Sequence, residues 1–252
     1  MNFGGSRLGF WWRWPPGLPN RNLSSNRVLV FYDEYTDGPG GNTDYYNTSG
    51  DVNPGTDVWP VIRDQEISLG FQPELIVGYD NLPSDMIKYA HAWDIGYASP
   101  YVTNPTFNPT NLLFGYLQAA GALFLLGENA NFGVRDDAID TFVTYCGGGS
   151  VTRSPTDYNT SVVATVEPEF LLANNNNSVT FSRPGTFTSY GSGTPISTAF
   201  TGSEYPGVCW KTGSLTNAPK GAITSVLDIN IFVAPFDQPD FIDNLSITLN
   251  KL

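Results

Sequence analysis

The sequence predicts an α/β protein built on an open, mostly parallel sheet with helices on both faces. Two observations carry this prediction. Strand-like and helix-like patterns alternate from residue 27 to residue 149, and such alternation requires parallel strands joined by right-handed crossovers. Residues 122–149 combine an apolar run, a short loop and a helical pattern closed by three glycines, which is typical of a buried strand, a sharp loop and a capped helix.

The segment up to residue 90 contains the first two predicted strands. Residues 27–33 form a continuous apolar run ending in an acid, as central parallel strands do, and the Gly-, Asn- and Tyr-rich residues 36–57 are predicted as a long loop. Apolar side chains at helical spacing, closed by a glycine, predict a helix over 57–70. Residues 74–79 are the second predicted strand, and Ser84 is expected to cap a short helical turn.

Two more strand and helix units follow. Residues 91–97 are the third predicted strand, Thr110 is expected to begin a helix, and the fourth strand begins at residue 122. A helix is predicted over 135–145. Glycines 147–149 come after this helix, so they are interpreted as its C-cap and not as a phosphate loop, which would precede a helix.

The pattern changes after residue 149. Short β-branched runs broken by Asn-, Gly- and Pro-containing turns predict a β-rich insertion at about residues 150–207. Strands are predicted again at 208–211 and 222–227, and Pro239 is expected to begin a final helix.

The N-terminal residues 1–26 form a distinct segment, which we expect to be extended. Three tryptophans would be costly to leave in water, so the segment must pack either on its own body or on a neighbouring subunit. The second alternative makes it a docking arm, followed by a single α/β domain over 27–252. The residues expected to dock are Arg7, Phe10, Trp11, Trp12, Arg13 and Trp14.

Charge is unevenly placed along the chain. The net charge is −12, yet residues 1–32 hold four arginines and no acid, which leaves −16 on the remaining 220 residues. A nucleic-acid groove needs Lys and Arg to neutralise phosphates, so nucleic acid is not an expected partner. A basic, aromatic arm instead precedes an acidic body, which suits docking between protein subunits.

Composition places the chain among globular proteins. An apolar fraction of 40% is ample for a core, and charged residues make up only 14%, against about 25% in an average soluble domain. Such Asn-, Thr- and Gly-rich surfaces suit extracellular or virion proteins. No apolar run approaches the roughly 20 residues of a membrane span, so none is expected.

The cysteines and the histidine limit the available chemistry. Cys146 and Cys209 are too few for a disulfide framework or a complete zinc site, and they are either one disulfide or two buried thiols. His91 is the only histidine, so no His-rich metal cluster exists.

Three segments carry a resemblance to a known family. They are residues 111–128, the helix ending in Cys146-Gly-Gly-Gly149, and residues 220–232 followed by Phe241-Ile-Asp-Asn-Leu245. Their order resembles the class I glutamine amidotransferase-like domains, which have a flavodoxin-like sheet and include non-catalytic relatives. The resemblance covers about residues 27–149 and 208–250, and it implies a flavodoxin-like fold.

An amidotransferase of this family needs a cysteine on the turn between a strand and a helix, with a histidine and an acid downstream. The corresponding turn here is Gly127-Glu-Asn-Ala-Asn131, which has no Cys or Ser, and His91 precedes both cysteines. We therefore expect no catalytic residue and no cofactor.

Acidic side chains near the predicted carboxyl ends of the strands are the alternative site, because open α/β sheets bind ligands there. A possible ligand crevice consists of Asp33, Glu34, Glu128, Asn129 and Asp228, with Asp80 nearby. Paired carboxylates could hold a cation or act in glycoside cleavage. The simpler interpretation, which we favour, is that they cap helices or are solvated, so no metal is predicted.

Two further groups have a simple and a functional interpretation. Asp136, Asp137 and Asp140 are expected to favour the helix dipole and to form a solvated face. Aromatic side chains could stack on sugars, although they are more often packing anchors: Tyr45, Tyr46, Trp59, Trp93 and Tyr97.

The sequence thus favours a non-catalytic structural or interaction subunit of an extracellular or viral assembly, docking through its N-terminal arm as a homo- or hetero-oligomer. The alternative is a carbohydrate- or metal-binding, hydrolase-like module that uses the acidic crevice.

Overall fold

The computed structural model describes residues 25–32, 58–96, 108–156, 158–173, 178–232 and 238–252. The expected docking residues of the arm, from Arg7 to Trp14, lie outside the described residues, as do Asp33 and Glu34 of the expected crevice.

A seven-stranded sheet forms the middle layer, with the order β2-β1-β3-β4-β11-β10-β9. Its parallel part consists of β1 (Arg27–Tyr32), β2 (Gln72–Val77), β3 (His91–Asp94), β4 (Ala122–Leu126) and β11 (Ala222–Val226). The antiparallel strands β10 (Gly207–Trp210) and β9 (Thr194–Pro195) complete it. The parallel order is the flavodoxin-like one, which confirms the predicted fold class.

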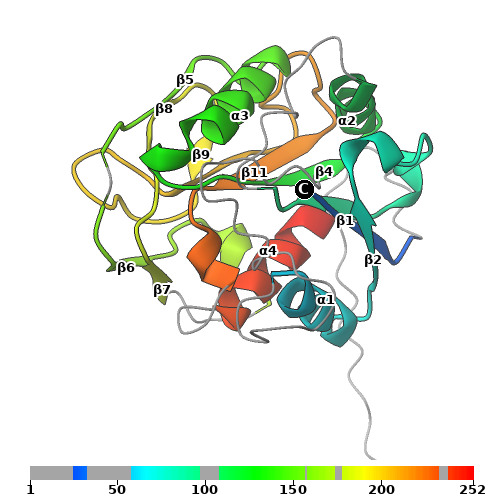
Figure 1. Cartoon of the computed structure of the whole chain (residues 1–252), viewed down its shortest axis with the longest axis horizontal. Helices are drawn as coiled ribbons and strands as arrows, with labels where there is room; N and C mark the ends of the chain where they lie inside the picture. Colours follow the sequence, from blue (N-terminus) through cyan, green and yellow to red (C-terminus); the bar gives the residue numbers. More distant parts are fainter. Residues whose placement is uncertain (1–24, 33–57, 97–107, 157, 174–177, 233–237) are drawn as a thin grey trace, which may run out of the picture.

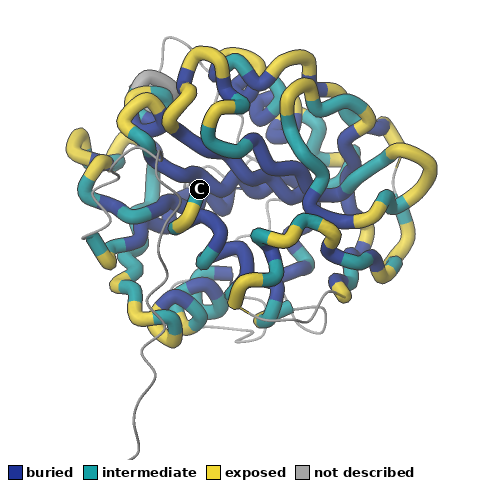
Figure 2. Tube along the Cα trace, turned by 180° about the vertical axis from the view of Figure 1, so that it is seen from behind, coloured by how far each residue is buried: buried dark blue, intermediate teal, exposed yellow. Residues whose placement is uncertain are grey.

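Helices cover both faces of the sheet (Figure 1). On one face lie α1 (Val58–Ser68) and α4 (Pro239–Lys251), and on the other lie α2 (Asn108–Gln118) and α3 (Gly133–Tyr145). Strand residues alternate between the two faces, so the sheet separates two apolar cores. Figure 2 shows the buried central strands enclosed by exposed outer turns.

Short 3-10 turns connect several of these elements. They are η2 (Tyr79–Asn81), η3 (Met86–Lys88), η5 (Ala130–Phe132), η6 (Pro168–Leu171) and η7 (Ile229–Phe232). The predicted cap of η3 is wrong, because its N-cap position is Asp85 and no side chain caps the turn. The short side chain of Ser84 lies one position too early for that bond.

The three glycines after α3 close the helix, as predicted. The Gly147 amide donates to the Thr144 carbonyl and the Gly148 amide to the Val143 carbonyl, both at 2.9 Å. Gly147 has a φ of 88°, so this end of the helix favours glycine.

The segment after Gly149 holds two small antiparallel sheets. β5 (Val151–Arg153) pairs with β8 (Phe187–Tyr190), and β6 (Ser161–Ala164) pairs with β7 (Ser178–Phe181). Their apolar side chains enter the two main cores, Phe181 on one side and Phe187 on the other. The insertion is therefore packed into the body of the protein.

No helix in the described part of the chain is both long and apolar enough to cross a bilayer.

Candidate functional site

The turn after β4 is the position at which an enzyme of the resembled family would hold its nucleophile. β4 is buried along its whole length and delivers Gly127 and Glu128 to the carboxyl edge of the sheet. Gly127 fits only because it has no side chain: an added Cβ would lie 2.4 Å from Leu227 Cδ2 and 2.6 Å from Asp136 Oδ1. The Glu128 amide donates to Asp136 Oδ1 at 3.0 Å, which fixes the turn against α3.

Glu128 points into the protein and is 2% exposed. Its Oε2 accepts the Ile229 amide at 2.7 Å, and its Oε1 accepts the Asn129 side-chain amide at 2.8 Å. Burial and the neighbouring Asp228 raise the pKa of Glu128 well above its usual range. Oε2 therefore joins the end of β4 to the beginning of η7, and Oε1 holds the turn itself.

Asp228 lies in the same buried region, after β11. Its Oδ1 accepts the backbone and side-chain amides of Asn230 at 2.9 and 2.8 Å, and its Oδ2 accepts the Ser182 amide at 2.5 Å. Burial raises the pKa of Asp228 to about 7. The structure thus places Glu128, Asn129 and Asp228 in one region, where the two carboxylates accept amides of the protein itself.

The turn between β7 and β8 lies directly on this region. The Gly185 amide donates to the Leu227 carbonyl at 2.8 Å, and the Asn230 side chain donates to the Ser182 carbonyl at 2.8 Å. A Cβ added to Gly185 would lie 2.4 Å from the Glu128 carbonyl oxygen. Backbone of the insertion therefore occupies the space directly over the turn after β4.

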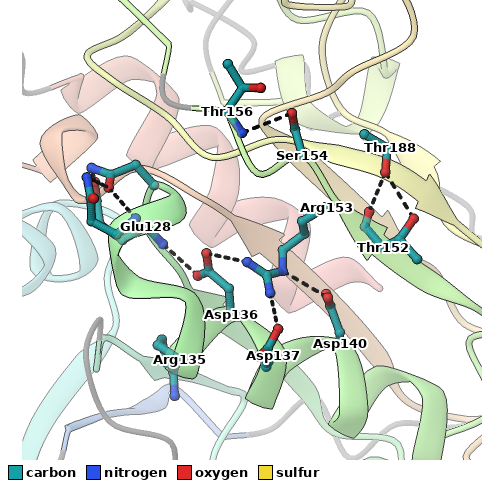
Figure 3. A network of polar contacts seen from close by, with 12 residues as sticks. Glu128, Arg135, Asp136, Asp137, Asp140, Thr152, Arg153, Ser154, Thr156 and Thr188 are labelled. Carbon is teal, nitrogen blue, oxygen red and sulfur yellow. Dashed lines mark hydrogen bonds and ion pairs between the residues drawn. The ribbon is translucent and has the colours of Figure 1, made fainter.

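Arg153 of β5 ties the insertion to α3 (Figure 3). Its guanidinium contacts Asp136 Oδ2 at 2.8 Å, Asp140 Oδ2 at 2.9 Å and the carboxylate of Asp137. Asp136 is 1% exposed, and burial raises its pKa to about 7 although Arg153 opposes the shift. The prediction of a solvated face is wrong for Asp136 and Asp140, because this long-range arginine covers them.

A buried ion pair lies at the carboxyl end of β3. Arg135 Nη2 is 3.1 Å from Asp94 Oδ1, and the Tyr79 hydroxyl donates to the same oxygen at 2.8 Å. Arg135 Nε also donates to the Leu126 carbonyl at 2.8 Å. Burial raises the pKa of Asp94 despite the positive charge of Arg135. Sequence patterns did not point to Arg135, because a single arginine early in a helix suggests a solvated side chain.

A second polar cluster lies in the core between α1, β3 and α4. Glu66 Oε1 accepts the Trp93 indole N–H at 2.7 Å and lies 2.7 Å from His91 Nε2, while Oε2 accepts the Ser246 hydroxyl at 2.8 Å. All four side chains are buried. Trp93 is thus a core residue and not a sugar platform. The burial of Glu66 could have been predicted from the sequence, because its four-residue spacing from Ile62 and Val58 places it on the buried stripe of α1.

The two thiols are free and buried, not joined in a disulfide. Burial raises the pKa of both Cys146 and Cys209 to about 12. Neither thiol is placed to act as a thiolate nucleophile at neutral pH.

The remaining candidates are the possible metal ligands and the aromatic side chains. Within the described residues, no group of three or more His, Cys, Asp or Glu side chains is arranged to hold a metal ion. Asp80 is exposed in η2, and Trp59 is half-buried against the core. Tyr45, Tyr46 and Tyr97 lie outside the described residues.

The strand order defines an α/β protein of flavodoxin-like fold, in which the insertion packs on the turn after β4 and on the residues after β11. The sequence matches no protein-family model and no curated protein significantly. Among solved structures, the mmIFT52 N-terminal domain superposes with a TM-score of 0.55 at 9% identity, covering 87% of this chain and 94% of that one. At this identity the likeness is one of fold alone.

Two other structures give lower scores. A putative ThuA-like protein from Bacteroides uniformis has a TM-score of 0.49 at 9% identity, covering 94% of this chain and 95% of its own. A glutamine amidotransferase from Thermotoga maritima has a TM-score of 0.45 at 10% identity, covering 88% and 95%.

Proposed function

We propose that this protein is a non-catalytic structural or interaction subunit of an extracellular or viral assembly. In this proposal the α/β domain is a scaffold, and the Trp- and Arg-rich N-terminal segment docks on neighbouring subunits. The observation that supports a non-catalytic role is the close approach of Gly185 to the Glu128 carbonyl, which leaves no room even for a Cβ at that point of the turn.

The side chains at that edge support the same proposal. Glu128 stands where the resembled enzymes need a thiol, and both of its oxygens accept amides of this chain. The two cysteines are buried away from that turn, with raised pKa values. A scaffold needs such internal contacts, whereas a catalyst needs groups free to meet a substrate.

The composition of residues 1–24 supports their proposed role in docking on another subunit. Residues 1–24 contain three tryptophans and three arginines and no acid, while the rest of the chain is strongly acidic. Opposite charge between an arm and a body favours association between subunits. The low charged fraction supports a place outside the cytosol, and detection of the chain in purified particles or culture medium would test that.

Removal of the arm tests the proposal. The deletion should end at residue 24, because the Ser25 hydroxyl contacts the Lys88 carbonyl and the Asn26 carbonyl accepts the Gln72 amide. We expect the shortened protein to keep its circular dichroism spectrum and melting temperature but to lose assembly in sedimentation experiments. Normal assembly by the shortened protein would contradict the proposal.

A further inference from the structure

Helix α4 is buried on most of its sides, so only a narrow part of its surface faces outward. On one side, the Asn244 side chain accepts the Ala173 amide at 2.9 Å, and on the other the Ser246 hydroxyl donates to Glu66 of α1. The face toward the sheet carries Leu245 and Leu249. Helical spacing leaves one narrow outward stripe, which consists of Asp240, Asp243, Ile247, Asn250 and Lys251.

Asp243 is the notable residue of this stripe. Its Oδ1 is covered from solvent yet has no hydrogen-bond partner among the described residues. Burial and the nearby negative charges of Asp240 and Glu66 raise the pKa of Asp243. Asp243 as a whole is only half-buried, so a cation from outside can approach this unpaired carboxylate and stabilise it.

Several other carboxylates of the body are matched by a cation of this chain. The pairs are Asp64 with Arg63, Glu74 with Arg27, Asp85 with Lys88, Asp137 with Arg153, and Glu167 with Lys211. In the part of the chain that the structure describes, Asp243 takes part in no ion pair. A cation from another molecule would therefore meet an unpaired carboxylate at Asp243.

Exposed apolar side chains lie on both sides of α4. Ile67 is 57% exposed and follows Glu66, which bonds to one side of the helix. Leu172 is 48% exposed and precedes Ala173, which bonds to the other side. Together with Asp243 and Ile247, these residues form what we call the α4 face. It combines an unpaired acid with apolar surface.

We propose that the α4 face binds residues 1–24 of a second copy of this chain, with an arginine on Asp243 and tryptophans over Ile67 and Leu172. This inference rests on the proposed function, because it names the surface on which the arm docks. The arm offers the matching chemistry, since Arg7, Arg13 and Arg21 can form paired hydrogen bonds with a carboxylate and the tryptophans supply large apolar area.

Sedimentation of the full-length protein over a range of concentrations tests the inference. Asp243→Asn removes the charge and keeps the size, and we expect the dissociation constant of self-association to rise about tenfold. Asp80→Asn is the matched control, because Asp80 is an exposed acid following β2, away from α4. It should leave self-association unchanged, and the melting temperature of each variant shows that it is folded.

The deletion of residues 1–24 separates this inference from the proposed function. Loss of assembly in both the deletion and Asp243→Asn supports both. Loss in the deletion alone overturns the α4 face as the docking site and leaves the proposed function standing. A wild-type protein that stays monomeric at all concentrations overturns the second copy as the occupant.

A second measurement applies even if Asp243→Asn fails to fold. In the full-length triple variant Arg7→Lys, Arg13→Lys, Arg21→Lys, a zero-length carbodiimide reagent can join an arm amine to the Asp243 carboxylate. Mixing isotopically light and heavy copies distinguishes cross-links between copies from those within one. A mixed-isotope cross-link to Asp243 is expected, and cross-links only within single copies would overturn the inference.

Discussion

At the scale of single residues, several acidic side chains are buried near the C-terminal ends of the parallel strands. Burial raises the pKa values of Asp136 and Asp228 from about 3.8 to about 7. A carboxyl group whose pKa is raised in the folded state binds its proton more tightly there than in the unfolded chain. Its stabilising effect is complete below the unfolded pKa and is lost as pH rises through the folded value.

The free energy of unfolding should therefore fall as pH rises from 5 to 8, by more than about 1 kcal/mol. In Asp228→Asn one of these groups cannot ionise, so the cost of the substitution should be larger at pH 5 than at pH 8. Urea unfolding at both pH values measures this difference. An equal cost at both would show that Asp228 does not contribute to the pH dependence.

At the scale of elements, two of the contacts that hold the insertion to the rest of the protein are Arg153 on α3 and Gly185 on the turn after β4. Neither could be predicted from sequence. Strands and helices leave periodic apolar patterns, whereas an arginine that pairs with acids 13 to 17 positions earlier leaves none. The sequence did predict the elements that these residues join, because their apolar runs and caps are local signals.

Arg153→Met should lower the free energy of unfolding by about 1–3 kcal/mol, because it leaves the buried oxygens of Asp136 and Asp140 without their hydrogen-bond donor. Arg63→Met is the matched control: the pair of Arg63 with Asp64 is solvent-exposed, so its loss should cost about 0–1 kcal/mol. Urea unfolding of both variants at pH 7.5 provides the comparison. Similar small costs would mean that Arg153 does not anchor the insertion.

Gly185→Ala should destabilise the protein by about 1–3 kcal/mol, since its Cβ would press on the Glu128 carbonyl oxygen. Gly115→Ala in α2 is the control, because an added Cβ there meets nothing within 4 Å and alanine favours a helix by up to about 1 kcal/mol. Thermal unfolding should show opposite signs for the two variants. A neutral Gly185→Ala would mean that the turn can lift away from the site.

At the scale of the whole molecule, both outer strands of the described sheet carry a proline. In β2, the backbone amides of Gln72 and Gly78 donate to residues on the β1 side of the strand. Backbone amides alternate in direction along a strand, so the amide position of residue 73 is on the outer edge of the sheet. Because that residue is Pro73, the outer edge has no N–H donor there. At the other edge, β9 has two residues, and one is Pro195. These prolines oppose pairing of sheet edges between copies, which favours association through another surface.

Pro73→Val should increase self-association, measured by light scattering at elevated temperature. The substitution gives the outer edge of β2 an unpaired backbone N–H and a β-branched residue that favours strands, and both promote pairing with the sheet edge of another copy. Gln72→Val is the matched control, since it adds the same side chain at a position whose amide already pairs with Asn26. Equal scattering from both variants would indicate that the added apolar side chain, and not the edge donor, is responsible.

The position of β11 also has a consequence for the order in which the chain can fold. Ala122 of the central strand β4 pairs with Ala222, so one side of β4 has no partner until about one hundred further residues have been made. At about 5–20 residues per second, synthesis leaves that apolar edge open for roughly 5–20 s. The fold therefore closes late, and aggregation during synthesis is most probable in the interval before β11 reaches β4.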